Sequence, residues 1–96
     1  MADPEVIKEV TGSKGRFLYA TPAGDAELTL SIASPSLVIA DHTEVPRALE
    51  GQGIGRKLVE ALVADARENG YRIVPLCPYV NAQRRKHPEW AEFFAV

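Results

Sequence analysis

The chain has 96 residues, and its eleven basic and thirteen acidic side chains leave a formal net charge of −2 at pH 7. This length suits one small domain over residues 1–96, built around a single hydrophobic core. A net negative charge argues against nucleic acid or an anionic membrane as a partner, because both attract basic surfaces. We therefore expect a protein that binds neither.

Cysteine content and hydropathy indicate the compartment. The chain has a single cysteine, Cys77, so an internal disulfide bond is excluded. Residues 1–10 lack the apolar stretch of a secretory signal sequence. No apolar run approaches the roughly 20 residues that cross a bilayer. These features predict a cytoplasmic protein.

Three extended segments are predicted in the first half of the chain. Residues 15–21 and 26–32 carry β-branched and aromatic side chains around the turn sequence PAGD, which predicts a β-hairpin. Residues 36–45 are apolar first and polar afterwards, and Pro46 ends this strand because proline donates no ladder hydrogen bond. The polar end of the third strand is therefore expected outside the ordinary core.

The second half of the chain changes from strand to helix periodicity. Apolar residues fall at helical spacing over residues 53–69, and Gly70 suits a left-handed helix cap. A short buried strand is predicted over residues 71–77, followed by about two helical turns over residues 80–87. The aromatic residues of segment 90–94 are expected to pack on the core or in a dimer contact.

A glycine-rich turn, EGQGIG at residues 50–55, directly precedes the predicted long helix. Such a turn exposes free backbone N–H groups at the positive end of the helix dipole, which favours an anion such as a pyrophosphate. Arg56 and Lys57 add positive charge where the dipole alone favours acids. The alternative is a tight turn followed by two solvated basic residues. A P-loop is excluded because Leu58 stands where that motif needs serine or threonine after its lysine.

The sequence HTEVPRALEGQGIGRKLVEALVADARENG, followed by VPLCPYV and RRKHPEW, resembles the small branch of the GNAT-type N-acetyltransferase superfamily over roughly residues 37 to 90. The resemblance implies an α/β fold with a mixed, mostly antiparallel sheet, one long helix after the glycine loop and short C-terminal helices. It also implies that acetyl-CoA lies in a V-shaped split between the strands predicted over residues 37–45 and 72–77. The implied reaction moves an acetyl group to an amine.

The same resemblance implies which residues contact the cofactor. The pyrophosphate would lie on the backbone N–H groups of Gln52, Gly53, Ile54, Gly55 and Arg56, with Lys57 adding charge, while main-chain groups near Glu44 and Val45 would pair with the pantetheine arm. Arg84 and Arg85 belong to the basic run RRKH, which would either contact the adenosine phosphates or form a solvated helix face.

Two positions depart from the superfamily pattern. Glu50 stands where the loop usually opens with arginine or glutamine. Near Gln83, the chain also lacks the tyrosine that often serves as general acid after the second cofactor strand.

Two polar residues at the end of the third strand are candidates for proton transfer. Residues two apart on a strand share a face, so His42 and Glu44 are expected to project together, with Asp41 and Thr43 on the other side. Acetyl transfer needs a neutral amine, so His42 is a candidate general base, with Glu44 orienting it or acting itself. The alternative is a pair of hydrogen-bonded polar residues without a catalytic role.

Cys77 lies at the end of the second predicted cofactor strand, close to the expected thioester. It could accept the acetyl group as a nucleophile, or serve as a small buried hydrophobic residue. A zinc site of Cys77, His42 and His87 lacks paired ligand spacing, so no metal is expected.

The sequence thus predicts an acetyl-CoA-dependent N-acetyltransferase with an unidentified amine acceptor, acting as a monomer or weak homodimer. The alternative is a module that binds CoA or acyl-CoA without turnover. A protein-interaction domain that has kept the fold is a third possibility.

Overall fold

The computed structural model describes residues 6–96. The prediction that the N-terminus is not a signal sequence falls partly on residues 1–5, which lie outside the described residues. The strands are β1 (Val6–Thr11), β2 (Lys14–Thr21), β3 (Gly24–Ser34), β4 (Leu37–Glu44) and β5 (Arg72–Val74). The α-helices are α1 (Ile54–Asn69) and α2 (Pro78–Lys86), and the short 3₁₀ helices are η1 (Arg47–Leu49) and η2 (Pro88–Phe93).

The five strands form one sheet in the order β1-β2-β3-β4-β5. Strands β1 to β4 pair with one another in an antiparallel arrangement, and β5 lies parallel to β4. A parallel neighbour needs a crossover connection, which α1 supplies. The predicted α/β fold with a mixed, mostly antiparallel sheet is confirmed.

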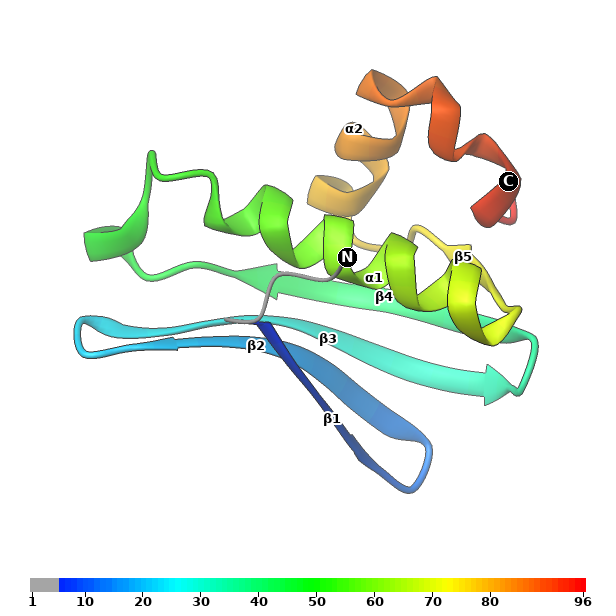
Figure 1. The fold of residues 1–96 in the computed structure, drawn as a ribbon, viewed down its shortest axis with the longest axis horizontal. Coiled ribbons are helices and arrows are strands. Elements are labelled where there is room, and N and C mark those ends of the chain that lie inside the picture. The colour runs from blue at the N-terminus through cyan, green and yellow to red at the C-terminus, as the bar shows by residue number, and fades with distance from the viewer. Residues whose placement is uncertain (1–5) are drawn as a thin grey trace.

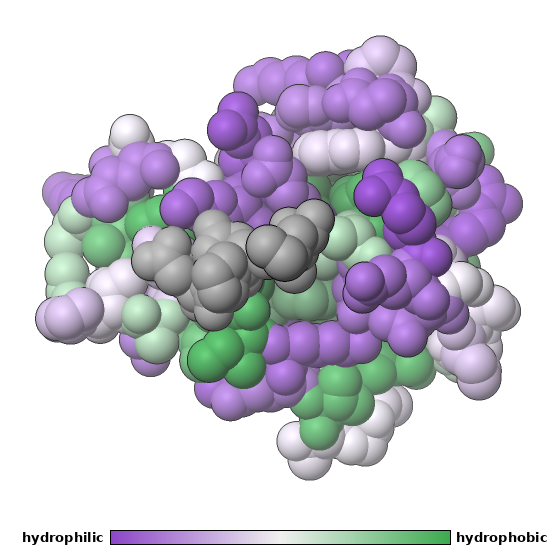
Figure 2. Space-filling model, in the orientation of Figure 1, coloured by the Kyte–Doolittle hydropathy of each residue, from purple (hydrophilic) through white to green (hydrophobic). Residues whose placement is uncertain are grey.

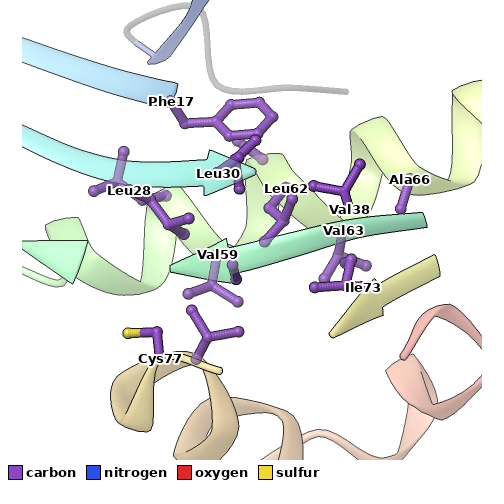
Figure 3. Close-up of a cluster of buried hydrophobic side chains, with 14 of the residues drawn as sticks. Phe17, Leu28, Leu30, Val38, Val59, Leu62, Val63, Ala66, Ile73 and Cys77 are labelled. Atoms are coloured by element: carbon purple, nitrogen blue, oxygen red, sulfur yellow. The ribbon is translucent and has the colours of Figure 1, made fainter. Parts of the chain in front are cut away.

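Both α-helices lie on the same side of the sheet (Figure 1). We call the covered side the helix face and the opposite side the open face. Leu28, Leu30 and Ile73 of the sheet are at most 2% exposed and belong to one core cluster with the apolar residues of α1. Figure 3 shows this cluster between the strands and α1. Burial of this cluster holds the layers together, because each Å² of apolar surface removed from water stabilises the fold by about 25 cal/mol.

Helix α1 begins one residue after its predicted start at 53, and it has the predicted end at Asn69 and the predicted Gly70 cap. Most of its apolar positions are buried, and Leu58 and Leu62 are 0% exposed. Gly53 at its start and Gly70 at its end both adopt left-handed conformations, with φ of 74° and 72°. A side chain is disfavoured at such φ values, which accounts for glycine at both ends.

The segment after α1 differs from its predicted bounds. Strand β5 covers only Arg72–Val74, rather than 71–77, because Pro75 has no N–H group to continue the ladder. Helix α2 begins at Pro78, two residues before the predicted start at 80, since proline is well suited to the first position of a helix.

Strand β1 was not predicted from the sequence. Five of its six residues are exposed, so the segment VIKEVT lacks the clear alternation of a half-buried strand. Its position depends on tertiary contacts. Lys8 forms an ion pair of 2.7 Å with Asp65 of α1, and the Tyr71 hydroxyl donates a hydrogen bond of 2.7 Å to the same carboxylate.

The C-terminal aromatic residues pack on the core, which confirms one of the two predicted alternatives. Trp90 is 9% exposed and Phe94 is 1% exposed. Phe94 forms a parallel bridge with Ile73, and the Ala95 N–H donates to the Ile73 carbonyl at 2.8 Å. The tail therefore covers the outer edge of β5.

The helical end of the molecule, at the top of Figure 2, is mainly hydrophilic. Among the described helices, none is long and apolar enough to cross a membrane.

Candidate active site

Strands β4 and β5 separate after a short parallel ladder. Their register pairs Leu37 with Arg72 and runs for three residue pairs. One further hydrogen bond, from the Cys77 N–H to the Ala40 carbonyl at 2.9 Å, ends the contact. Beyond it, no backbone hydrogen bond joins the two segments within residues 6–96. The polar end of β4 thus keeps one free backbone edge, facing a split.

A β-bulge at Asp41 decides which way the end of β4 faces. Leu30 pairs with Ala40 and Thr29 pairs with His42, which leaves Asp41 without a partner. Paired residues share a face, so Thr43, opposite the buried Leu28, lies on the helix face.

His42 and Glu44 both lie on the open face, opposite Thr29 and Glu27 of β3. Both side chains are exposed. Asp41 also belongs to the open face, where its carboxylate accepts a hydrogen bond of 2.6 Å from the Ser31 hydroxyl. The expectation that Asp41 and Thr43 project to the same side is therefore wrong, because the bulge at Asp41 interrupts the alternation and leaves Asp41 and His42 on the same face.

The glycine loop gives α1 an N-terminus without a side-chain cap. Gly51 and Gly53 have φ of 81° and 74°, and a Cβ added at either would meet nothing within 4 Å. The Gly53 cap forms no side-chain hydrogen bond, and the first turn of α1 holds no acid. The first backbone hydrogen bond of the helix runs from the Lys57 N–H to the Gly53 carbonyl at 3.1 Å. The N–H groups of residues 53–56 have no backbone acceptor in the described part of the chain, so they are free to hold an anion.

One groove joins the glycine loop to the split. Its volume is about 320 Å³. It is lined by Thr43, Val45, Leu49, Glu50, Gly51, Gly53, Ile54, Gly55 and Tyr79. The structure thus brings together the predicted residues Val45, Gly53, Ile54 and Gly55, while Gln52 is exposed outside the lining.

Tyr79 is a groove residue that the sequence reasoning missed. It belongs to the first turn of α2, and a Cβ added to Gly55 would lie 2.7 Å from its hydroxyl oxygen. Burial raises the pKa of the Tyr79 phenol, while Arg56 lowers that pKa by a smaller amount. The phenol therefore stays protonated at neutral pH. The resemblance to the superfamily points to a tyrosine near Gln83, so it does not single out an aromatic residue two positions after Cys77.

Cys77 lies behind Thr43 and is not among the residues that line the groove. It is 2% exposed, and its Sγ lies 3.4 Å from the Thr43 Oγ1. Figure 3 shows Cys77 at the start of α2, at the border of the core cluster. Because Thr43 lies on the helix face, Cys77 and His42 approach the split from opposite sides of β4.

The predicted basic contacts do not line the groove. Arg56 lies 3.6 Å from Glu60, and the Lys57 Nζ lies 5.5 Å from the Tyr19 ring centroid. Arg84 donates a hydrogen bond of 2.8 Å to the Asn81 side chain, whereas Arg85 is exposed. None of these four cations is among the residues that line the groove.

A second groove, of about 440 Å³, reaches the open face. Its lining includes Lys14, Arg16, Thr29 and Asp41. Thr29 is the cross-strand partner of His42, so this groove adjoins the candidate base. Two grooves therefore meet β4, one from each side.

The fold and the glycine loop place the chain within a known class of protein. The family model described as GCN5-related N-acetyl-transferase matches residues 16–93. The chain belongs to this family of N-acetyltransferases.

A solved structure supports the same assignment. The chain is similar to a GCN5-like candidate N-acetyltransferase from Staphylococcus aureus, known from an NMR solution structure. The two share 26% sequence identity with a TM-score of 0.69, over 97% of this chain and 91% of the other. A comparison with curated proteins gives no match.

Proposed function

We propose that the protein transfers the acetyl group of acetyl-CoA to an amine. The observation that carries this proposal is the single groove from the uncapped glycine loop to the split between β4 and β5. Membership of the N-acetyltransferase family supports it.

The glycine loop fits a pyrophosphate. Gly51 and Gly53 leave open space beside the main chain, and no acid in the first turn of α1 opposes an anion. The N–H groups of Gly53, Ile54 and Gly55, followed by that of Arg56, would hold the phosphate oxygens. Gln52 lies at the exposed tip of the same loop, and Arg56, Lys57, Arg84 and Arg85 would add positive potential around the adenosine phosphates.

The pantetheine arm would follow the free edge of β4. Among residues 6–96, no strand pairs with the backbone of Glu44 and Val45 on this side, so its polar groups are free to pair with amide groups of the arm. This path leads toward Thr43, which lines the groove and contacts the buried Cys77.

His42 would act as the general base from the open face. The amine nitrogen attacks the thioester carbonyl carbon, its proton passes to the imidazole, and the bond to sulfur breaks to release the CoA thiolate. Glu44 shares this face and would orient the imidazole or attract a cationic acceptor. The acceptor would enter through the groove beside Asp41.

Cys77 has the surroundings of a residue that shapes the pocket. It is buried against Thr43 and precedes Pro78, with no basic side chain among its hydrogen-bond partners. A nucleophilic thiolate needs a nearby cation or base. We therefore propose direct transfer from acetyl-CoA to the amine.

Binding of CoA or acyl-CoA without turnover is the second candidate. It is favoured by the exposure of His42 and Glu44, whose side chains form no hydrogen bond or ion pair with another described residue. A base that no neighbour orients is a weaker catalyst.

The deciding experiment compares Gly53→Glu with Gly70→Glu by calorimetry. The two glycines have nearly the same φ, both have open space, and they lie at opposite ends of α1. The backbone strain and added charge are thus matched, and only position 53 faces the proposed anion. We expect Gly53→Glu to abolish acetyl-CoA binding and Gly70→Glu to retain it. Equal affinity in both variants would remove the loop from the site.

A further inference from the structure

Tyr79 and Gly55 meet where the first turns of the two helices face each other. A Cβ built on Gly55 would lie 2.7 Å from the Tyr79 hydroxyl oxygen, 2.9 Å from Cζ and 3.1 Å from Cε2. These separations are shorter than ordinary contacts between carbon atoms, which lie near 3.5–4.0 Å. Any side chain at position 55 would therefore displace the ring.

The backbone itself does not require glycine at position 55. Gly51 and Gly53 have positive φ, whereas Gly55 lies inside α1 and is absent from the positive-φ residues. Alanine is about 1 kcal/mol more favourable than glycine within a helix. The space that Tyr79 occupies is thus a sufficient reason for glycine here.

The contact joins the two ends of the proposed cofactor path. Gly55 is the last residue of the glycine loop, and Tyr79 stands two residues after Cys77. Tyr79 also lines the groove, together with Thr43 of β4 and Val45 just after it. Its position thus fixes the width of the groove between loop and split.

We propose that Tyr79 is a positioning residue of this site. Its ring, seated over Gly55, holds the glycine loop and the Cys77 turn at a set separation and forms the wall along the pantetheine arm. A cofactor anchored by its pyrophosphate then delivers its thioester to the free edge of β4 beside Thr43. This inference rests on the proposed function.

The ring carries this role, rather than the hydroxyl group. The Tyr79 hydroxyl forms no hydrogen bond with another residue in the described part of the chain. Tyr79→Phe should therefore keep most of the affinity for CoA, while Tyr79→Ala should not.

The first test compares two ligands by calorimetry, namely CoA and its nucleotide half, adenosine 3′-phosphate 5′-diphosphate. In Tyr79→Ala, we expect CoA to bind about tenfold more weakly, because the arm loses its apolar wall. The nucleotide half should bind within about twofold of its wild-type affinity, since the loop remains. A purely structural role would weaken both ligands alike, and that outcome would overturn the proposal.

The second test is a double-mutant cycle between the two positions. In Gly55→Ala, the displaced ring enters the groove, so CoA should bind about tenfold more weakly. In the Tyr79→Ala background, the same change should cost no further affinity and should raise the melting temperature, because alanine is the better helix former. Glu68→Gln, an exposed change near the far end of α1, serves as the control for each measurement.

The outcomes separate this inference from the proposed function. An equal loss of affinity from Gly55→Ala in both backgrounds would mean that Gly55 acts on the anion directly, and the inference would fail. If the wild-type protein binds neither CoA nor the nucleotide half, the proposed function itself would be contradicted.

Discussion

At the scale of single residues, one extra residue in β4 determines which side chains of the site face the groove and which lie on the open face. The bulge at Asp41 turns Thr43 toward the groove and leaves His42 and Glu44 on the open face. The proposed base and the buried thiol are thereby placed on opposite sides of the strand. An amine and a thioester would meet only at the free edge between them.

His42→Gln tests the base. If the imidazole removes the amine proton, acetyl transfer should fall by about 10²-fold. Affinity for acetyl-CoA should stay nearly unchanged, since the groove lies on the other face. Initial rates and calorimetry on the same preparation measure both effects. Parallel losses of affinity and of thermal stability would show a structural role for His42.

Cys77→Ala separates direct from covalent transfer. Because the thiol is buried beside Thr43, we expect the variant to bind acetyl-CoA and to retain part of any transferase activity. Intact-protein mass spectrometry after mixing wild-type protein with acetyl-CoA, without acceptor, should show no stable adduct. An acetyl adduct that forms on the wild-type protein as fast as turnover, and does not form on Cys77→Ala, would show that transfer is covalent.

Glu50 places a carboxylate in the lining of the groove, close to the proposed anion. Glu50→Arg should tighten CoA binding by about 1 kcal/mol or less, because the side chain is exposed. The gain should shrink as salt is raised from low to physiological concentration. A loss of affinity that salt does not change would indicate that Glu50 supports the loop structurally.

At the scale of elements, Asp65 and Tyr71 attach the edge strand to the end of α1. The Asp65 carboxylate accepts from the Tyr71 hydroxyl and pairs with Lys8 of β1, each at 2.7 Å. Burial raises the pKa of Tyr71, and the hydrogen bond to Asp65 raises it further. The phenol therefore stays protonated in the folded protein at pH values where the unfolded chain ionises.

Tyr71→Phe should lower the free energy of unfolding by about 1.5–3 kcal/mol at pH 7, through loss of a hydrogen bond to a charged group. A raised folded-state pKa contributes stability below the unfolded value of about 10, and this contribution is lost as pH rises above it. The difference in free energy of unfolding between wild type and Tyr71→Phe should therefore shrink above about pH 10. Urea unfolding across this pH range measures the difference. A difference that does not change with pH would contradict a raised pKa of Tyr71 in the folded protein.

At the scale of the whole molecule, one core cluster includes residues of the sheet, both α-helices and the C-terminal tail. We therefore expect a single cooperative unfolding transition. Acetyl-CoA at 100 times its dissociation constant should raise the free energy of unfolding by about 2.7 kcal/mol. For a domain of this size, that corresponds to a rise of about 10–20 °C in melting temperature.

Scanning calorimetry with and without acetyl-CoA measures this rise. Gly53→Glu provides the control, because it should melt at the same temperature in both conditions. Two separate transitions would contradict a single cooperative unit, and an unchanged wild-type melting temperature would contradict cofactor binding.

Local chemistry determined much of the fold from the sequence alone. The hairpin, helix α1 and its Gly70 cap follow from side-chain periodicity and from the few residues that tolerate left-handed backbone. The glycine loop before α1 could be identified for the same reason, since Gly51 and Gly53 serve backbone conformations that few other residues adopt.

Only the tertiary structure decided the edge strand and the composition of the site. Strand β1 carries no clear periodicity, because its exposed residues contact other elements through single ion pairs rather than a buried face. The bulge at Asp41 depends on register with β3, which no local pattern in β4 records. Tyr79 reaches Gly55 across 24 residues of chain. Such contacts arise from the packing of whole elements, so sequence spacing does not reveal them.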